Sequence, residues 1–282
     1  MGVTVLWSSS WILIRNGLDD EALAPITFAG LRYGLAATVL LIVVSTSRTR
    51  RAEIRSLDRR STLRLMLLGV VFYTFTQGAQ FIAIDNQPAA TTSLVLSLTP
   101  LLVASVASRS LGELASPRQF VGGTLIVMGA ALYFSGDLGA TAIGLAAALV
   151  ALGANVTGAL LGRHVNRAQV ISPLTVTTVS MTTGAVLLLA AGLAIDGPPS
   201  VTLRAWLIIG WLATVNTALA FTLWNLSLRR LSAIESSGIN NTMLIQIALL
   251  AWVFLDEAPG TLGAVGIVTV SMGIFLTQLR SS

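Results

Sequence analysis

The sequence predicts an all-α polytopic membrane protein, with ten transmembrane helices arranged as two inverted five-helix repeats. Hydrophobic residues make up 54% of the chain and charged residues only 10%, and the mean hydropathy is +0.82. A soluble domain carries roughly 25% charged residues, so this composition indicates an integral membrane protein. A third observation, a repeat inside the chain, predicts how the helices are arranged.

Ten stretches are apolar enough to cross a membrane, which takes about 20 residues of helix. We expect helices over 2–17, 26–46, 63–84, 89–110, 117–135, 140–162, 172–194, 204–226, 233–254 and 260–278. The first stretch is short for a bilayer, so we expect the natural chain to begin several residues before Met1. Only the connection 47–62 is longer than a turn, which leaves no room for a soluble catalytic or nucleotide-binding domain.

Residues 89–132 and 233–276 are weak copies of each other without a gap, and the shared positions include Glu113/Glu257, Gly122/Gly266 and Gly129/Gly273. An odd number of predicted helices separates the copies, so the second copy is inverted in the membrane. Inverted repeats are typical of transporters, whose substrate site lies between the repeats. We therefore predict two halves, 1–137 and 138–282, that work by alternating access.

All seventeen basic residues are arginine, and their distribution predicts the orientation. With a cytoplasmic N-terminus, fourteen arginines fall in inner connections and only Arg204 at an outer end, as the positive-inside rule requires. This predicts a multi-pass protein of a bacterial inner membrane with both termini cytoplasmic. We expect the basic stretch 48–64 to anchor the topology and contact anionic membrane lipid, not nucleic acid.

The order of several motifs resembles the EamA-type branch of the drug/metabolite transporter superfamily. The motifs are the run 218–230, Leu255-Asp256-Glu257, Leu98-Thr99-Pro100, Leu111-Gly112-Glu113 and the glycines that follow each glutamate. The resemblance implies ten helices around a central cavity and traffic in small organic solutes, often outward. It departs at Pro100, which has no counterpart in the ninth helix, so a symmetric proline hinge is not implied.

Polar side chains inside predicted helices are the candidates for solute binding, because they are costly in hydrocarbon. Tyr73, Gln77 and Gln80 recur at i, i+4 and i+7 on one helix face. The other candidates are Trp7, Asn155, Asn216, Trp224, Asn240 and Gln246. Together they suit an amphipathic organic molecule with a few hydrogen-bonding groups. The alternative is that these side chains join helices without contacting a solute.

Five further residues are candidates for gating or structural roles. Arg15 lies near the outer end of the first helix and can snorkel to headgroups. Arg32 lies deeper, where it can either snorkel or face inward and bind a carboxylate or phosphate. We expect Pro100, together with Gly238, to permit bending. Glu113 and Glu257 precede helices at opposite membrane faces, where a structural capping role is favoured.

Several kinds of chemistry are excluded by what the chain lacks. Without cysteine or lysine it forms neither a thiolate metal site nor a phosphate-binding loop that ends in lysine. No motif of an intramembrane enzyme is present, so we predict no catalytic residues, no metal and no cofactor. We predict a secondary transporter, an exporter of small organic metabolites such as amino acids or drug-like compounds. The alternative is a non-transporting membrane scaffold or sensor, and the oligomeric state stays open, a monomer included.

Overall fold

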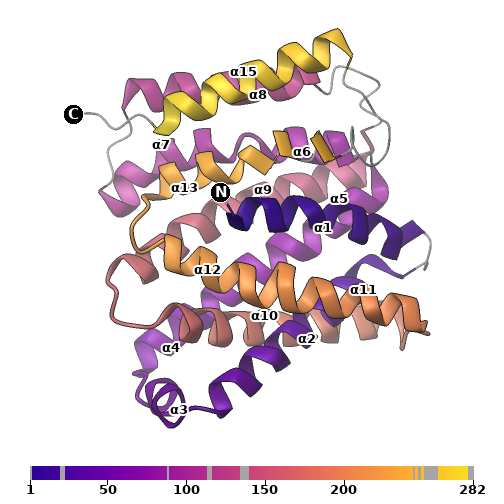
Figure 1. Cartoon of the computed structure of the whole chain (residues 1–282), viewed down its shortest axis with the longest axis vertical. Coiled ribbons are helices and arrows are strands. Elements are labelled where there is room, and N and C mark those ends of the chain that lie inside the picture. Colours follow the sequence, from indigo (N-terminus) through magenta and orange to yellow (C-terminus); the bar gives the residue numbers. More distant parts are fainter. Residues whose placement is uncertain are drawn as a thin grey trace.

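A computed structural model describes residues 2–19, 23–87, 89–112, 116–133, 140–243, 245–246, 249–250 and 260–278. Within them the chain is helical, and each of the ten predicted stretches contains helix (Figure 1). The helices are α1 Gly2–Asp19, α2 Pro25–Ser45, α3 Arg48–Arg55, α4 Arg59–Gly69, α5 Thr76–Asn86, α6 Ala89–Leu96, α7 Thr99–Leu111, α8 Pro117–Tyr133, α9 Ala142–Arg167, α10 Pro173–Asp196, α11 Leu203–Ala213, α12 Ala220–Ser227, α13 Ala233–Asn240 and α15 Thr261–Gln278. Two π-helical segments, η1 Val70–Phe75 and η2 Thr214–Leu219, complete the set. The prediction of an all-α polytopic membrane protein is confirmed.

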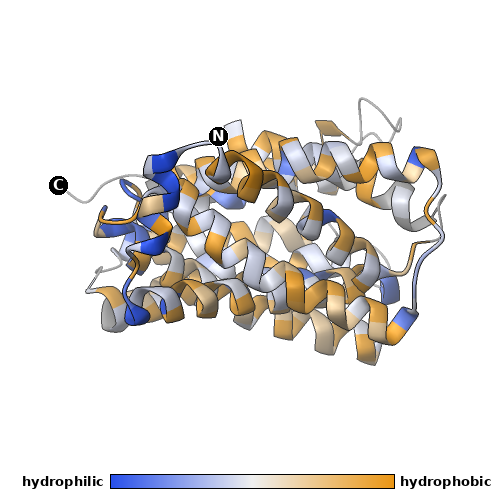
Figure 2. Ribbon diagram, turned by 90° about the horizontal axis from the view of Figure 1, so that it is seen from below, coloured by the Kyte–Doolittle hydropathy of each residue, from blue (hydrophilic) through white to orange (hydrophobic). Residues whose placement is uncertain are grey.

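Five helices of the described chain are long and apolar enough to cross a membrane: Pro25–Ser45, Arg59–Asn86, Ala142–Arg167, Pro173–Asp196 and Leu203–Ser227. Shorter apolar helices cover Thr91–Ala107 and Thr261–Thr277. Large apolar side chains such as Ile143, Leu207 and Phe275 are exposed along the bundle, as expected of a surface that faces lipid acyl chains. Hydrophilic residues instead gather at the end where the arginines of α3 lie, on the left in Figure 2.

Several predicted helices differ from the observed ones: α3 lies inside the predicted connection 47–62, and the ninth predicted helix is interrupted at Asn241. The third extends further at both ends, over Arg59–Asn86, because α4, η1 and α5 join without a break. The fourth is not continuous: α6 ends at Leu96 and α7 begins at Thr99. Pro100 lies in the first turn of α7, where its missing N–H costs no intrahelical hydrogen bond.

The first residues of four segments recur at the spacing of the sequence repeat. The segments α4, η1, α6 and α8 begin at residues 59, 70, 89 and 117, and α11, η2, α13 and α15 begin at 203, 214, 233 and 261. The π-helical segments thus occupy equivalent places in the two copies. A π-helical turn is rare in proteins, so its presence twice at one spacing is a structural counterpart of the weak sequence repeat.

Helices α8 and α15 lie side by side in Figure 1 and pack backbone against backbone at four glycines. A Cβ atom added to Gly122 would lie 2.6 Å from the carbonyl oxygen of Gly273, and one added to Gly129 would lie 2.7 Å from that of Gly266. The pairing is antiparallel and reciprocal, because Gly266 and Gly273 are the repeat equivalents of Gly122 and Gly129. Small residues at such contacts permit close packing in lipid, where no hydrophobic effect drives helices together.

Helices α2 and α10 also pack closely at glycines. Gly30 contacts the backbone of Leu189, and Gly192 contacts that of Thr27. Around this contact lies the largest buried apolar cluster, which includes Phe28, Tyr33, Met181, Leu188, Ile209 and Leu212. This rigid pair holds Arg32 and Tyr33 of α2 toward the interior of the bundle, where both are buried.

The short basic helix α3 is attached to the start of α10 through Glu53. The carboxylate accepts hydrogen bonds from the Ser172 backbone N–H at 2.6 Å, from the Ser172 hydroxyl at 2.8 Å and from the Thr175 hydroxyl at 2.9 Å. Partial burial acts to raise the pKa of Glu53, but these bonds and the charge of Arg229 outweigh it and lower the pKa. The ionised carboxylate therefore stabilises this end of the bundle.

The packing of α8 on α15 predicts that Gly129→Ala destabilises the protein by about 1–3 kcal/mol, because the new methyl group overlaps backbone atoms. The measurement is the free energy of unfolding in detergent. Gly153→Ala is the matched control, since Gly153 lies in α9 with no atom within 4 Å of its added Cβ, and it should be neutral or slightly stabilising. Equal effects of the two substitutions would contradict the close packing.

The Glu53 contacts predict a specific pH dependence. Because the pKa of Glu53 is lowered in the folded state, its stabilising contribution is complete above the ordinary glutamate pKa of about 4.3 and is lost as the pH falls through the folded value. The difference in unfolding free energy between wild type and Glu53→Gln should therefore be larger at pH 7 than at pH 3.5. A difference independent of pH would show that the charge of Glu53 contributes nothing.

Candidate functional site

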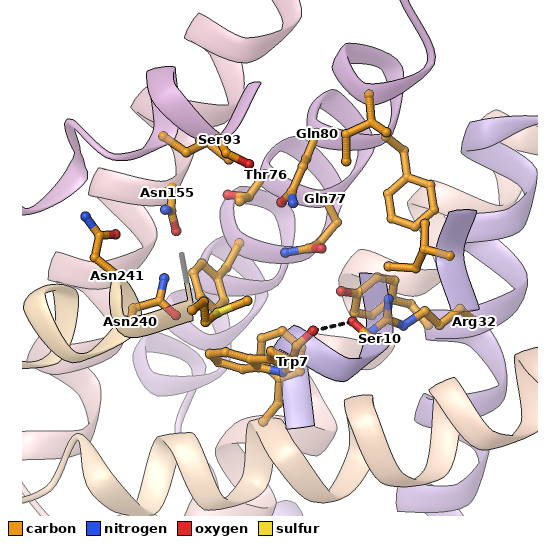
Figure 3. A pocket seen from close by; sticks show the side chains of 18 of the residues that line it. Trp7, Ser10, Arg32, Thr76, Gln77, Gln80, Ser93, Asn155, Asn240 and Asn241 are labelled. Carbon is orange, nitrogen blue, oxygen red and sulfur yellow. Dashed lines mark hydrogen bonds between the residues drawn. The ribbon is translucent and has the colours of Figure 1, made fainter. Parts of the chain in front are cut away.

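A cavity of about 140 Å³, the main cavity below, lies among α1, α2, α5, α6, α9, α12 and α13, so both copies of the repeat contribute to its wall. Six residues that the sequence singled out line it: Trp7, Arg32, Gln77, Gln80, Asn155 and Asn240. Figure 3 shows Arg32 and Ser10 on one side and Asn155, Asn240 and Asn241 on the other, with Gln77 and Gln80 between them. Polar groups of distant segments therefore converge on one space.

A second, smaller cavity of about 40 Å³ adjoins the first and shares Trp7, Phe72, Asn155 and Asn240 with it. The predicted residues Tyr73 and Trp224 line this smaller cavity and not the main one. The π-helical segment η1 explains the position of Tyr73. Its wider turn displaces Tyr73 from the face that an α-helix would share with Gln77 and Gln80.

A cluster of aromatic side chains lies where the two cavities adjoin. The ring of Trp7 lies 4.8 Å from that of Phe221 and 5.2 Å from that of Trp224, and the Tyr73 and Phe221 rings are 5.0 Å apart. Phe72 packs edge-on against both Tyr73 and Phe221. These faces offer an apolar surface to the middle of a bound molecule, while the amides lie around it.

Several polar groups around the main cavity have no partner within the described chain. The indole Nε1 of Trp7, a donor, and the amide Oδ1 of Asn240, an acceptor, are buried without a hydrogen bond. The amides of Gln77 and Gln80 make no side-chain hydrogen bond to any residue that the structure describes. Buried polar groups are normally satisfied, so these groups mark a place where a bound molecule would supply the missing partners.

The wall of the main cavity contains two equivalent helix interruptions. Ser97 lies in the break between α6 and α7, and Asn241, 144 residues later, follows the end of α13. The Asn241 side chain donates to the Ser97 carbonyl oxygen at 3.2 Å, so the two breaks are in contact. Asn155 of α9 donates to the Thr99 hydroxyl at 3.2 Å beside them. The break at Asn241 forms without a proline at the position equivalent to Pro100, where Leu244 stands.

Arg32 is the one charged residue among the described residues that line the main cavity. Its side chain is 3% exposed, and its Nε donates to the Thr217 hydroxyl at 2.8 Å. Its guanidinium carbon lies 5.4 Å from the centre of the Tyr33 ring. Within the part of the chain that the structure describes, no carboxylate pairs with this guanidinium.

Asn216 and Gln246 do not line either cavity. The Asn216 amide donates to the Leu6 carbonyl oxygen and, at 3.2 Å, to the Ser9 hydroxyl, which joins η2 to α1. Gln246 accepts from the Ser8 hydroxyl at 2.9 Å and donates to the Thr4 hydroxyl at 3.0 Å, which joins α1 to the ninth predicted helix. These contacts match the alternative interpretation of buried amides as links between helices.

Some predicted residues lie outside what the structure describes, and some lining residues were not predicted. Glu113, Glu257 and the side chain of Arg15 lie outside the described residues. The lining residues that the sequence did not single out for binding include Ser10, Tyr33, Phe72, Phe81, Ser93 and Phe221. In apolar helices such aromatic and small hydroxyl residues look alike whether they face lipid, core or cavity. Among the described residues no cluster of His, Cys, Asp or Glu could hold a metal ion.

A family model described as the EamA-like transporter family matches residues 1–135 and 142–279. A solved crystal structure superimposes with a TM-score of 0.80 over 98% of this chain and 93% of the other, at 17% sequence identity, which is a likeness of fold.

Three curated relatives cover most of the chain. An uncharacterized transporter of Bacillus subtilis, YyaM, is 25% identical over 88% of this chain and 85% of its own length. A probable terminal-alkyne amino-acid exporter of Streptantibioticus cattleyicolor is 27% identical over 98% and 91%. An S-adenosylmethionine/S-adenosylhomocysteine transporter of Chlamydia trachomatis is 26% identical over 94% and 84%.

The two kinds of buried amide should respond differently to substitution. Asn216→Ala removes bonds between η2 and α1 and should lower the free energy of unfolding by about 0.6–1.7 kcal/mol, the range for such bonds in membranes. Gln80→Ala, whose amide faces the main cavity, should change stability by less than about 0.5 kcal/mol. Chemical unfolding in detergent measures both. A reversed order would contradict the assignment of Asn216 to helix packing.

Proposed function

This chain belongs to the EamA-like transporter family and is a transporter of small metabolites rather than an enzyme, and we propose that its solute binds in the main cavity and crosses by alternating access. The observation that carries the proposal is the set of unpartnered polar groups on this cavity, Trp7 Nε1 and Asn240 Oδ1 foremost. Leaving such groups unsatisfied is costly, and a solute with complementary groups removes that cost. Family membership also argues against the alternative of a non-transporting scaffold or sensor.

The two moving units in this proposal are the halves 1–137 and 138–282, inverted relative to each other. The recurrence of the first residues of four segments at one spacing and the reciprocal pairing of glycines on α8 and α15 support this division. The separate family matches to 1–135 and 142–279 divide the chain at nearly the same place. The paired breaks at Ser97 and Asn241, with Pro100 and Gly238 beside them, are the points where bending costs least hydrogen bonding.

We assign solute contacts to Trp7, Gln77, Gln80, Asn155 and Asn240 in the main cavity, and to Tyr73 and Trp224 in the adjoining one. Asn216 and Gln246 hold α1 against the neighbouring helices and act on the solute only through that packing. Arg15, Glu113 and Glu257 keep the roles that the sequence predicts for them, at the membrane surface and as caps.

The solute class in this proposal is a small organic metabolite, such as an amino acid or a drug-like compound, and its direction is outward. The names of two relatives, an amino-acid exporter and a transporter of S-adenosyl compounds, support molecules of this size. We place the protein in a bacterial inner membrane with both termini in the cytoplasm. The arginine-rich end in Figure 2, where α3 lies, would then face the cytoplasm and anionic lipid.

Counterflow in proteoliposomes tests the function. Vesicles that contain the purified protein are loaded with pooled amino acids, nucleosides, sugars or cationic dyes, and uptake of the labelled solute is compared with that of protein-free vesicles. Stimulated exchange of one class supports the carrier and identifies its solute type. No stimulation by any solute of the panel would contradict transport through this cavity.

Gln77→Ala and Trp224→Ala should each lower the rate of exchange by about tenfold. Each removes a lining side chain whose contact with the solute contributes roughly 1.4 kcal/mol to the binding free energy. Leu207→Ala is the control, since Leu207 is 68% exposed on the outside of α11. Membrane insertion and gel-filtration profiles should be the same for all three. Wild-type exchange by correctly inserted Gln77→Ala and Trp224→Ala would remove these residues from the solute path.

A further inference from the structure

We propose that Arg32 binds a carboxylate of the transported solute and so selects for singly charged organic acids. The inference rests on the proposed function of the main cavity and names the solute chemistry of that site. Its starting point is the burial of a permanent charge. A guanidinium inside a membrane protein is costly unless it is paired or marks a path for a charged species, and Arg32 has only a hydroxyl as hydrogen-bond partner within the described chain.

The contacts of Arg32 leave one edge of the guanidinium available. Nε is occupied by the Thr217 hydroxyl, and the Tyr33 ring lies beside the guanidinium carbon. The two terminal nitrogens make no hydrogen bond to a described residue. Arginine binds carboxylates through two parallel N–H···O bonds along one edge of its plane. A guanidinium fixed by its Nε and open at its terminal nitrogens is suited to this mode.

Thr217 is positioned for this role by the π-helical segment η2. Asn216, its neighbour, points to α1, while Thr217 faces α2 and reaches Arg32 across 185 residues of sequence. Thr217 is fully buried, so its hydroxyl has a fixed environment. The threonine therefore orients Arg32 without contacting the solute, and we treat it as a positioning residue.

Charge balance favours a carboxylate over a phosphate. Arg32 supplies one positive charge, and the remaining described residues of the cavity wall are neutral amides, hydroxyls and apolar groups. A carboxylate makes the site neutral overall, whereas a phosphate dianion leaves an uncompensated charge in a medium of low dielectric constant. The acceptor Oδ1 of Asn240 lies on the opposite side of the space from Arg32 (Figure 3). The solute should thus carry a hydrogen-bond donor at the end away from its carboxylate.

The test measures binding to the reconstituted protein in lipid nanodiscs, by the shift of the thermal unfolding midpoint with ligand concentration. The probes are matched pairs of singly charged acids and neutral amides: N-acetylphenylalanine and N-acetylphenylalaninamide, N-acetylleucine and N-acetylleucinamide, and N-acetylglutamine and N-acetylglutaminamide. Phenyl phosphate is the phosphate probe. In wild type, at least one acid should bind tenfold or more tightly than its amide and than phenyl phosphate. Arg32→Met should abolish the preference, and Arg32→Lys should retain part of it.

Thr217→Val keeps the volume of threonine and leaves Arg32 in place, so it should lower the acid preference about three- to tenfold without changing the binding of the amide. Arg230→Met, an exposed arginine at the end of the bundle, is the control and should behave as wild type. Equal binding of acid and amide in every pair, tighter binding of phenyl phosphate, or an unchanged preference in Arg32→Met would each overturn the inference.

The failure of this inference is distinguishable from failure of the proposed function. Exchange of a carboxylate-bearing solute at equal rates in wild type and Arg32→Met vesicles would overturn the role of Arg32 and leave the carrier intact. Equal loss of exchange for charged and neutral solutes in a folded Arg32→Met protein would assign Arg32 to the structure rather than to selectivity. Absence of exchange of every solute in wild type would instead contradict transport itself.

Discussion

The structure depends above all on one constraint. In hydrocarbon a polar group must find its hydrogen-bond partner inside the protein, because no water is present to supply one. Most buried polar side chains obey it by bonding to the preceding turn or across a helix interface, as Asn225 does with Thr177 at 3.0 Å. Among the described residues, two of the atoms that do not, Trp7 Nε1 and Asn240 Oδ1, line the cavities. The others, on Gln87, Asn166, Thr182, Asn216 and Arg229, line neither cavity, so it is the convergence of polar groups on one space that locates the site.

The same constraint bears on two backbone features that recur in both copies of the repeat, the π-helical segments and the helix breaks. The weak sequence similarity of the copies does not predict either feature. A π-helical turn or a helix break exposes backbone carbonyls that need partners, so either feature persists only where the surroundings supply them. Here both features occur at equivalent positions of the two copies: η1 and η2, and the breaks at Ser97 and Asn241. The side-chain amide of Asn241, at one break, supplies a donor to the Ser97 carbonyl oxygen at the other.

Hydropathy was sufficient to predict the apolar helical stretches, because the length of an apolar stretch is a local property. It predicted neither α3 nor the breaks at Ser97 and Asn241. Residue spacing predicts that Gln77 and Gln80 share a helix face, and both line the main cavity from α5. Tyr73 and Asn216 do not line that cavity, and both lie in π-helical segments whose register no local pattern indicates. The sequence also could not predict that Phe72 and Phe221 line the main cavity. Whether an aromatic side chain faces a cavity depends on which helix lies opposite, and the residue type does not indicate this.

The two helix breaks occupy equivalent positions of the repeat but carry different side chains, Ser97 and Asn241. Asn241 donates to the carbonyl oxygen of Ser97, yet Ser97 cannot return an equivalent bond, because its hydroxyl already donates to Leu94 within its own helix at 2.7 Å. Arg32 adds a second asymmetry, as a charge that reaches from the first copy to Thr217 of the second. Two identical halves would give inverted conformations of equal free energy, whereas unequal contacts give one conformation a lower free energy. A solute that pairs with Arg32 changes that difference, and this is how binding in the cavity can be coupled to the exchange between conformations.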